Sequence, residues 1–259
     1  MTGVDGVVLW EQRGHVAIIT LNRPEVRNAV DAATSRAVAE VVRRVDDTPG
    51  VRVAVLTGAG SVFSAGADLA ALDRGELEGI IGVEGGFCGI VRAQRRKPLI
   101  AALNGSALAG GCELALACDV VVAADDAELG LPEARLGIIA GAGGLIRLPQ
   151  VLGPKRAMEL ILTGDRIGAV EAAELGLVNH CVPRDEVLGR ALDIAEKIAA
   201  NAPVAVEESR MVVEAFLNGT AEDAWLRNAS AWTRVLATDD AAEGPRAFVE
   251  RREPRWTGS

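Results

Sequence analysis

Tyrosine is absent from the sequence, and aromatic residues make up only 3% of it. No tyrosine can therefore serve as a catalytic acid or as a hydroxyl donor to a ligand. Histidine is almost as scarce, with His15 and His180 alone, and the four cysteines form no C-x-x-C pair. Zinc sites need closely grouped nitrogen and sulfur ligands, so these spacings argue against a metal site.

The beginning of the sequence lacks a basic segment followed by an apolar run, so we expect no signal peptide. No stretch of about 20 apolar residues is present either, and a membrane-spanning helix needs one. Cys112 and Cys118 lie in an apolar run, which predicts buried free thiols of a reducing compartment. We therefore expect a soluble cytoplasmic protein with no membrane partner.

Positive charge is also in short supply, because the formal net charge is −9 at pH 7. Nucleic-acid-binding proteins normally carry a basic face, so this balance argues against a nucleic-acid partner. An anionic small ligand remains compatible with it, since a local group of basic residues can override the overall sign. Two such groups, each of which a solvated face would also explain, are Arg92, Arg95, Arg96 and Lys97, and Arg246, Arg251, Arg252 and Arg255.

Three common motifs are missing. No G-x-x-x-x-G-K-[ST] phosphate loop and no G-x-S-x-G nucleophile turn occurs. Gly58-Ala59-Gly60 begins like a dinucleotide-binding loop, but Phe63 stands where the third glycine is required. These absences exclude the classes of enzyme that depend on each motif.

The chain does contain short apolar strands and helices in alternation. Asp31 is the expected N-cap of a helix that runs to about Val45, and a short helix is expected at 111–118. The glycine-rich segment 75–89 fits no element, and we expect it to be mobile. Short apolar runs predict strands at 7–10, 16–21, 51–57, 99–103 and 120–124, and 51–57 is rich in β-branched residues.

After residue 145 the pattern becomes mostly helical. The composition shifts near residue 200, so we divide the chain into an α/β core at 1–200 and a helical C-terminal region at 201–259. The predicted helices of this half are 154–162, 169–176, 186–200, 203–217 and 221–237.

Two glutamates are the most informative residues of the chain, because each accompanies a run of small residues. Glu113 ends the segment Asn104-Gly105-Ser106-Ala107-Leu108-Ala109-Gly110-Gly111-Cys112-Glu113, and Glu133 follows Gly130-Leu131-Pro132. Small side chains let a substrate approach backbone N–H groups closely. Two carboxylates can provide one general acid and one general base. The pair indicates acid–base chemistry beside a site that stabilises an oxyanion.

The ordered set of motifs resembles the enoyl-CoA hydratase (crotonase) family over nearly the whole chain. Each motif alone is weak, but their order along the sequence is specific. The segments that carry the resemblance are Asn22-Arg23-Pro24-Glu25, Phe63-Ser64-Ala65-Gly66-Ala67-Asp68-Leu69, Asn104-Gly105, Gly110-Gly111-Cys112-Glu113, Pro132-Glu133, Gly141-Ala142-Gly143-Gly144 and Leu162-Thr163-Gly164-Asp165.

The resemblance implies an α/β fold, a crotonase-like spiral of ββα units with a helical C-terminal trimerisation region. It implies an acyl-CoA thioester as substrate, with no further cofactor because coenzyme A is part of that substrate. A homotrimer or a dimer of trimers is the implied assembly. The basic tail around Arg251 and Arg252 could then reach the CoA phosphates of its own or a neighbouring subunit.

The family pattern also assigns roles to residues. Glu113 corresponds to the base that deprotonates a water, and Glu133 to the acid that protonates the α-carbon. The backbone N–H groups of Ala67 and Gly110 correspond to the oxyanion hole, which would hold the thioester oxygen. The implied substrate- or CoA-binding residues are Arg27, Ala29, Ala65, Gly66, Asp68, Leu69 and Gly141.

The leading hypothesis is a hydro-lyase that adds water to a 2-trans-enoyl-CoA and gives a 3-hydroxyacyl-CoA. Retention of both glutamates favours this reaction over the others of the family. An enoyl-CoA isomerase or another specialised acyl-CoA enzyme of the same fold is the alternative. A catalytically silent CoA-binding relative is the alternative from a different class.

Overall fold

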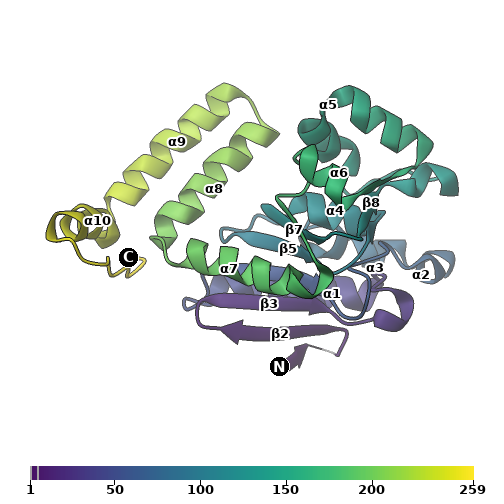
Figure 1. The fold of residues 1–259 in the computed structure, drawn as a ribbon, viewed down its shortest axis with the longest axis horizontal. Coiled ribbons are helices and arrows are strands. Elements are labelled where there is room, and N and C mark those ends of the chain that lie inside the picture. The colour runs from purple at the N-terminus through teal and green to yellow at the C-terminus, as the bar shows by residue number, and fades with distance from the viewer. Residues whose placement is uncertain (1, 5) are drawn as a thin grey trace.

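The computed structural model describes residues 2–4 and 6–259 of the chain (Figure 1). Its centre is a seven-stranded sheet in the order β1-β2-β3-β4-β5-β7-β10. The first three strands pair antiparallel, and from β3 onward all neighbours are parallel. The strands are β1 (Thr2–Val4), β2 (Val8–Arg13), β3 (Val16–Leu21), β4 (Val53–Gly58), β5 (Leu99–Leu103), β7 (Val120–Ala124) and β10 (His180–Val182).

The middle strands read as continuous apolar runs because both faces of the sheet are covered. Every residue of β4 and β5 is buried, as expected for parallel strands that lie between helices. Helix α1 (Ala32–Asp47) follows Asp31, as predicted. The Asp31 carboxylate caps it by accepting a 2.8 Å hydrogen bond from the Thr34 N–H. Helix α7 (Val187–Ala199) packs against β3, β4, β5 and β7.

A small second sheet precedes the two segments that contain Glu113 and Glu133. It consists of β6 (Ala107–Leu108), β8 (Glu128–Gly130) and β9 (Arg166–Gly168) in the order β6-β8-β9. Helix α4 (Gly110–Ala117) begins two residues after β6, and the 3₁₀ helix η3 (Pro132–Leu136) begins two residues after β8. Because β6 and β8 are parallel neighbours, the starts of α4 and η3 emerge at the same edge.

The glycine-rich segment differs from the sequence prediction, which gave it no element. After α2 (Leu69–Asp73), the structure has α3 (Leu77–Ile81) and a 3₁₀ turn η2 (Phe87–Gly89) within this segment. The segment packs on α1: the Ser35 hydroxyl donates to the Ile80 carbonyl over 2.7 Å. At Gly89, an added β-carbon would lie 2.5 Å from Ala39. The close contact with α1 therefore explains why a glycine stands at position 89, although a glycine-rich composition by itself suggests flexibility.

The second half of the chain is helical, as predicted, with one helix that the sequence pattern did not suggest. It contains α5 (Gly144–Thr163), α6 (Ala169–Glu174), α8 (Pro203–Asn218), α9 (Ala221–Leu236) and the unpredicted α10 (Asp239–Glu250). The backbone of α5 is interrupted at Gly153, so its second part matches the helix predicted at 154–162. The remaining 3₁₀ turns are η1 (Pro24–Val26) and η4 (Arg184–Glu186).

Helices α8 and α9 run side by side and project from the body of the molecule, with α10 beyond them near the C-terminus (Figure 1). One carboxylate ties α8 to the sheet. Asp119 accepts hydrogen bonds from the Arg95 and Arg210 guanidinium groups and from the Leu99 N–H. Within the described part of the chain, no helix combines the length and apolar content that a bilayer crossing requires.

Candidate functional site

One large cavity, of about 1090 Å³, collects residues from distant parts of the chain. Its walls come from η1, from α2 and α3, from the starts of α4 and η3, and from the first turn of α5. Both glutamates singled out in the sequence line it. A cavity of this size exceeds what most small ligands fill and suits a long molecule that enters from one side.

Glu113 is buried on the first turn of α4, with 3% of its surface exposed. Its Oε1 atom accepts two backbone hydrogen bonds, from the Ala142 N–H at 2.7 Å and from the Gly144 N–H at 2.9 Å. No protein donor of the described chain reaches Oε2. The carboxylate is therefore held in one orientation by one oxygen, while the other stays available to a ligand or a water.

Glu133 is buried near the start of η3, with 5% exposed, and it has a different environment. Its Oε2 atom is buried, and within residues 2–4 and 6–259 it has no hydrogen-bond partner. A buried polar atom without a partner is costly, and such atoms are often found where a ligand group completes the site. The unpaired oxygen of Glu133 therefore leaves a hydrogen-bonding position that a ligand group could fill.

The two environments separate the proton affinities of the carboxyl groups. Burial, together with the nearby charge of Glu113, raises the pKa of Glu133 to about 7. Burial also raises the pKa of Glu113, but the Gly144 and Ala142 N–H groups and the charge of Arg147 oppose the rise. At neutral pH the pair can therefore consist of an ionised Glu113 and a protonated Glu133, which is one base and one acid.

Two backbone N–H groups also line the cavity beside the carboxylates. Ala67 and Gly110 are among its lining residues, and across the described chain neither backbone nitrogen donates to a protein acceptor. Gly110 is the first residue of α4, so the positive end of the helix adds to the field at its nitrogen. Two unpaired donors at one cavity wall can stabilise an oxyanion.

Gly66 brings these donors together without lining the cavity itself. Its backbone has a φ of +91°, which favours glycine, and an added β-carbon would lie 2.6 Å from the Gly110 nitrogen. Ala109, just before α4, has a positive φ of 52° although it carries a side chain. The backbone on both sides of the donor pair is therefore unusual, which is common where geometry serves a site.

The other candidate residues surround the same cavity. Arg27, Ala29, Ala65, Asp68, Leu69 and Gly141 all line it. Arg27 has left-handed backbone geometry, and its carbonyl accepts a 3.0 Å hydrogen bond from the Ala65 N–H. The Asp68 carboxylate caps α2 and pairs with Arg23 at 3.1 Å, so it also has a structural role. Every residue proposed for the site thus lines the cavity, with the single exception of Gly66.

Sequence reasoning missed other residues of the cavity wall. Phe87, Arg147 and Asn218 line it, and so does Arg92 from the first basic group. The other members of that group have structural roles: Arg95 is bound by Asp119, and the Lys97 ammonium donates to the Val45 and Thr48 carbonyls. No motif surrounds Arg147 or Asn218, so only the three-dimensional arrangement could identify them.

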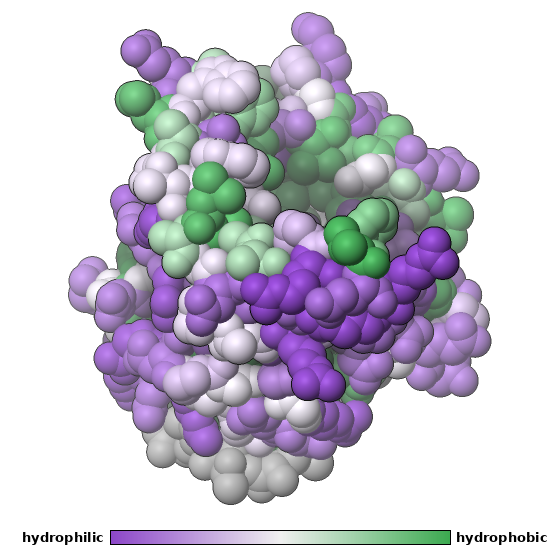
Figure 2. Space-filling view, turned by 90° about the vertical axis from the view of Figure 1, so that its left-hand side faces the viewer, coloured by the Kyte–Doolittle hydropathy of each residue, from purple (hydrophilic) through white to green (hydrophobic). Residues whose placement is uncertain are grey.

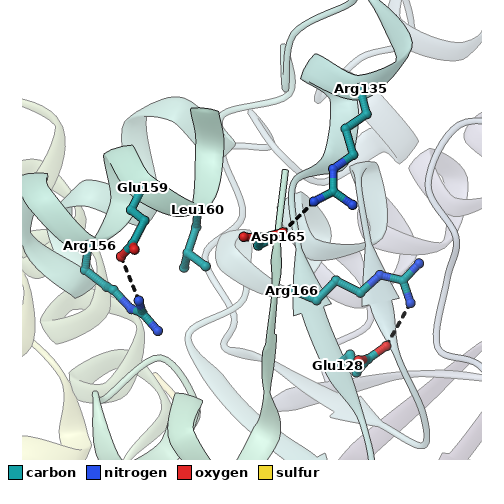
Figure 3. Close-up of a pocket in the computed structure, with 7 residues that line it drawn as sticks. All are labelled: Glu128, Arg135, Arg156, Glu159, Leu160, Asp165 and Arg166. Atoms are coloured by element: carbon teal, nitrogen blue, oxygen red, sulfur yellow. Dashed lines mark hydrogen bonds and ion pairs between the residues drawn. The ribbon is translucent and has the colours of Figure 1, made fainter. Parts of the chain in front are cut away.

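A second hollow, of about 480 Å³, is a less suitable site (Figure 3). Its charged side chains neutralise one another in pairs: Arg135 with Asp165, Arg156 with Glu159, and Arg166 with Glu128. None of the sequence-derived candidates lies there. In the described part of the chain, no group of three or more His, Cys, Asp or Glu residues is placed to hold a metal ion.

The basic tail does not contribute to the cavity of its own subunit. The Arg252 guanidinium is paired with Glu243 at 2.6 Å and with Glu250 at 2.6 Å. Arg252 follows α10, which lies at the opposite end of the molecule from α2 and α3 (Figure 1). Neither Arg251 nor Arg252 lines the cavity, so a contact of this tail with the CoA phosphates of its own or a neighbouring subunit stays a prediction.

Fold and cavity together define an α/β protein with a buried carboxyl pair facing two free backbone donors. The chain belongs to the enoyl-CoA hydratase/isomerase family, whose model matches residues 11–259. The predicted fold class, a crotonase-like α/β fold with a helical C-terminal region, is thereby confirmed.

Three relatives illustrate the similarity. A carnitinyl-CoA dehydratase of Proteus mirabilis is 42% identical over 252 residues, which cover 95% of this chain and 96% of the relative. The crystal structure of an enoyl-CoA hydratase from Mycobacterium tuberculosis H37Rv matches with a TM-score of 0.93 and 46% identity, over 98% of this chain and 100% of that one. That of a carnitinyl-CoA hydratase from Mycobacterium avium matches with a TM-score of 0.78 and 44% identity, over 98% and 99%.

Proposed function

We propose that the protein is a hydro-lyase that adds water to a 2-trans-enoyl-CoA and gives a 3-hydroxyacyl-CoA. The observation that carries the proposal is the carboxyl pair, in which Glu113 is oriented by two N–H groups and Glu133 has a pKa raised by burial to about 7. The names of the relatives support a reaction of this class, since they include hydratases and dehydratases of CoA thioesters.

In the proposed mechanism the thioester oxygen accepts hydrogen bonds from the Ala67 and Gly110 N–H groups. Glu113 removes a proton from a water through its free Oε2, and the water oxygen forms a bond to the β-carbon. The electron pair of the double bond moves toward the carbonyl, so negative charge grows on the oxygen between the two donors. Glu133 then gives its proton to the α-carbon as the carbonyl forms again, and the same steps in reverse describe dehydration.

The remaining candidate residues fit the binding of coenzyme A. Arg27 is exposed at the cavity rim, where its guanidinium can pair with a phosphate. Ala65 and Leu69 flank the Ala67 donor and offer backbone groups and an apolar surface to the nucleotide portion. Small residues at Ala29 and Gly141 leave room for the thioester arm.

The test is the loss of the absorbance of the conjugated thioester when crotonyl-CoA is added, combined with mass spectrometry of the product. Hydration adds the mass of one water, whereas an isomerase leaves the mass unchanged. A family member that only binds CoA would bind crotonyl-CoA without changing either signal. The proposal is abandoned if a panel of enoyl-CoA thioesters of different length gives no hydrated product.

The surface of the C-terminal helices supports the proposal that the protein assembles as a homotrimer or as a dimer of trimers. Figure 2 looks at this end of the molecule and has hydrophobic residues gathered over its upper part, around a hollow. Monomeric proteins rarely expose so much apolar surface in one region. The large exposed apolar residues of α8, α9 and α10 are Val213, Phe216, Leu217, Trp225, Leu226, Trp232, Leu236, Phe248 and Val249.

A further inference from the structure

The cavity wall contains two guanidinium groups to which the proposed mechanism assigns no contact with the substrate. Arg92 and Arg147 both line the cavity, and neither belongs to an ion pair of the described chain. The Arg92 guanidinium forms no hydrogen bond with the described protein atoms, and its aliphatic part packs against Gly86. A few charged groups in a cavity wall determine the orientation and the chemical type of the ligand group that binds beside them.

Arg147 is fixed in position beside the catalytic base. Its guanidinium donates to the Val91 carbonyl at 2.5 Å and, weakly, to the Ala142 carbonyl at 3.5 Å. An added β-carbon on Gly143 would lie 2.1 Å from Arg147 Nη1, so the group lies directly against the loop that orients Glu113. A guanidinium has five N–H groups, and these two hydrogen bonds leave others free for a ligand.

The two arginines are on a different side of the oxyanion donors from the proposed coenzyme-binding loops. A β-carbon on Gly110 would touch both the Phe87 ring, at 2.6 Å, and the Gly66 Cα, at 3.3 Å. Gly110 therefore lies between the loop that contains Gly66 and the segment that continues from Phe87 to Arg92. If the coenzyme lies along the loop that contains Gly66, the acyl group extends toward the segment from Phe87 to Arg92.

Among the described residues, Glu113 is the acidic lining residue whose charge acts on Arg147. Apart from the catalytic pair, the acidic lining residues are Glu25 and Asp68, which belong to the coenzyme side together with Arg27. Glu214 lies near Arg147 but does not line the cavity, and it pairs with Arg210 at 2.9 Å. Asn218 adds an amide to the same wall.

We infer that the acyl group of the preferred substrate ends in a carboxylate, which Arg92 and Arg147 bind at the acyl end of the cavity. This inference rests on the proposed function and narrows it to enoyl-CoA thioesters with an anionic tail. A charged acceptor forms strong, bidentate hydrogen bonds with a guanidinium. A quaternary ammonium, such as a carnitinyl group carries, would face two like charges and a single aromatic ring, Phe87, which is too little for an aromatic cage.

Three thioesters that share the same conjugated unit test the inference. Glutaconyl-CoA ends in a carboxylate, crotonyl-CoA in a methyl group and crotonobetainyl-CoA in a trimethylammonium group. We expect kcat/KM to fall in that order, with glutaconyl-CoA preferred over crotonobetainyl-CoA by on the order of 10²-fold. Equal values for the three, or a preference for the cationic thioester, would overturn the inference while leaving the hydro-lyase proposal intact.

Binding measurements keep the inference testable if hydration itself is not observed. Glutaryl-CoA and butyryl-CoA are saturated and cannot be hydrated, so calorimetry with them reports only recognition of the acyl end. We expect glutaryl-CoA to bind about tenfold more tightly. Similar dissociation constants would reject the anionic tail whether or not the hydro-lyase proposal holds.

Substitutions identify the residues responsible. Arg92→Met removes a guanidinium that holds no protein group, so the fold is expected to persist and the preference for glutaconyl-CoA over crotonyl-CoA to fall about tenfold. Arg147→Met should act in the same direction, although it also releases the Val91 and Ala142 carbonyls. The matched control is Arg43→Met, an exposed arginine of α1 outside the cavity, which should leave the preference unchanged. A preference unaffected in both Arg92→Met and Arg147→Met would reject the assignment.

Discussion

Gly66 and Gly110 are packed so closely that a β-carbon on Gly66 would lie 2.6 Å from the Gly110 nitrogen. A single methyl group at Gly66 must therefore displace one of the two free donors of the cavity. The same methyl group would also occupy a backbone with a φ of +91°, where side chains are strained.

We expect Gly66→Ala to reduce kcat by about 10²–10³, the usual effect of losing one oxyanion donor. The strain alone is controlled by Gly176→Ala, because Gly176 has a φ of +80° and an added β-carbon there meets nothing within 4 Å. Steady-state kinetics and thermal melting of both variants separate the two effects. If Gly66→Ala lost no more activity than Gly176→Ala, the donors would not be the oxyanion hole.

Glu113→Gln and Glu133→Gln should each lower kcat by roughly 10²–10⁴, because an amide keeps the shape but cannot transfer the proton. Binding of a CoA thioester, measured by calorimetry, should persist in both variants. Glu174→Gln is the matched control, since Glu174 is exposed on α6. Full turnover in either active-site variant would contradict the two-glutamate mechanism.

The pH dependence of hydration should be bell-shaped. The proposed mechanism requires an ionised Glu113 and a protonated Glu133, so kcat/KM should fall as the pH rises through about 7, the raised pKa of Glu133. On the acid side it should fall as Glu113 takes up a proton, above the ordinary carboxyl range because burial raises the pKa of Glu113. In Glu133→Gln, the residual activity should no longer fall as the pH rises through about 7. If that fall stayed at the same pH in this variant, its cause would be the titration of another group.

The same carboxyl group should lower stability at alkaline pH. The pKa of Glu133 is raised in the folded protein, so the contribution of this group to stability is complete below the ordinary carboxyl pKa and is lost as the pH rises through about 7. Glu133→Gln should therefore increase the free energy of unfolding above pH 7 by up to about 3 kcal/mol, and much less at pH 4. Urea unfolding at both pH values measures this difference, and equal stabilities of variant and wild type above pH 7 would count against a buried carboxyl group with a raised pKa.

Light scattering should give a mass of three or six times 26.9 kDa. Trp232→Glu should reduce this mass, because it places a charge on the apolar surface of α9, where Trp232 is 65% exposed. Ser230→Glu introduces the same charge at an exposed polar position of the same helix and should leave the mass unchanged. A wild-type protein that stays monomeric at working concentration would remove the assembly proposal.

The regular elements could be predicted from the sequence wherever a local pattern determines them. Asp31 and the valines of α1 predicted that helix, and short apolar runs predicted β3, β5 and β7 with correct positions. The segment 75–89 could not be predicted, because its order depends on contacts with α1, such as that of Gly89 with Ala39. Helix α10 was missed since its internal Pro245 and Gly244 weaken the helical pattern.

In the candidate site, too, local motifs located some residues, whereas others depend on tertiary contacts. Glu113 and Glu133 stand in motifs, so the sequence located them, but their different environments depend on loop 142–144 and on a buried oxygen that no motif reveals. Arg92 was noticed only as one of several basic residues, and folding separated it from Arg95 and Lys97. Arg147 left no local signal at all, because its position depends on the carbonyl of Val91, 56 residues away in the chain.

In the proposed mechanism, the donors that face the thioester oxygen belong to the main chain, whereas the acid and base are side chains on separate turns. A point mutation can therefore replace or delete a proton-transferring group without dismantling the stabilisation of the enolate. Natural variation has the same freedom. A chain with this backbone could exchange hydration for another reaction of an acyl-CoA by changing one or two carboxylates, while the handling of the coenzyme is inherited unchanged.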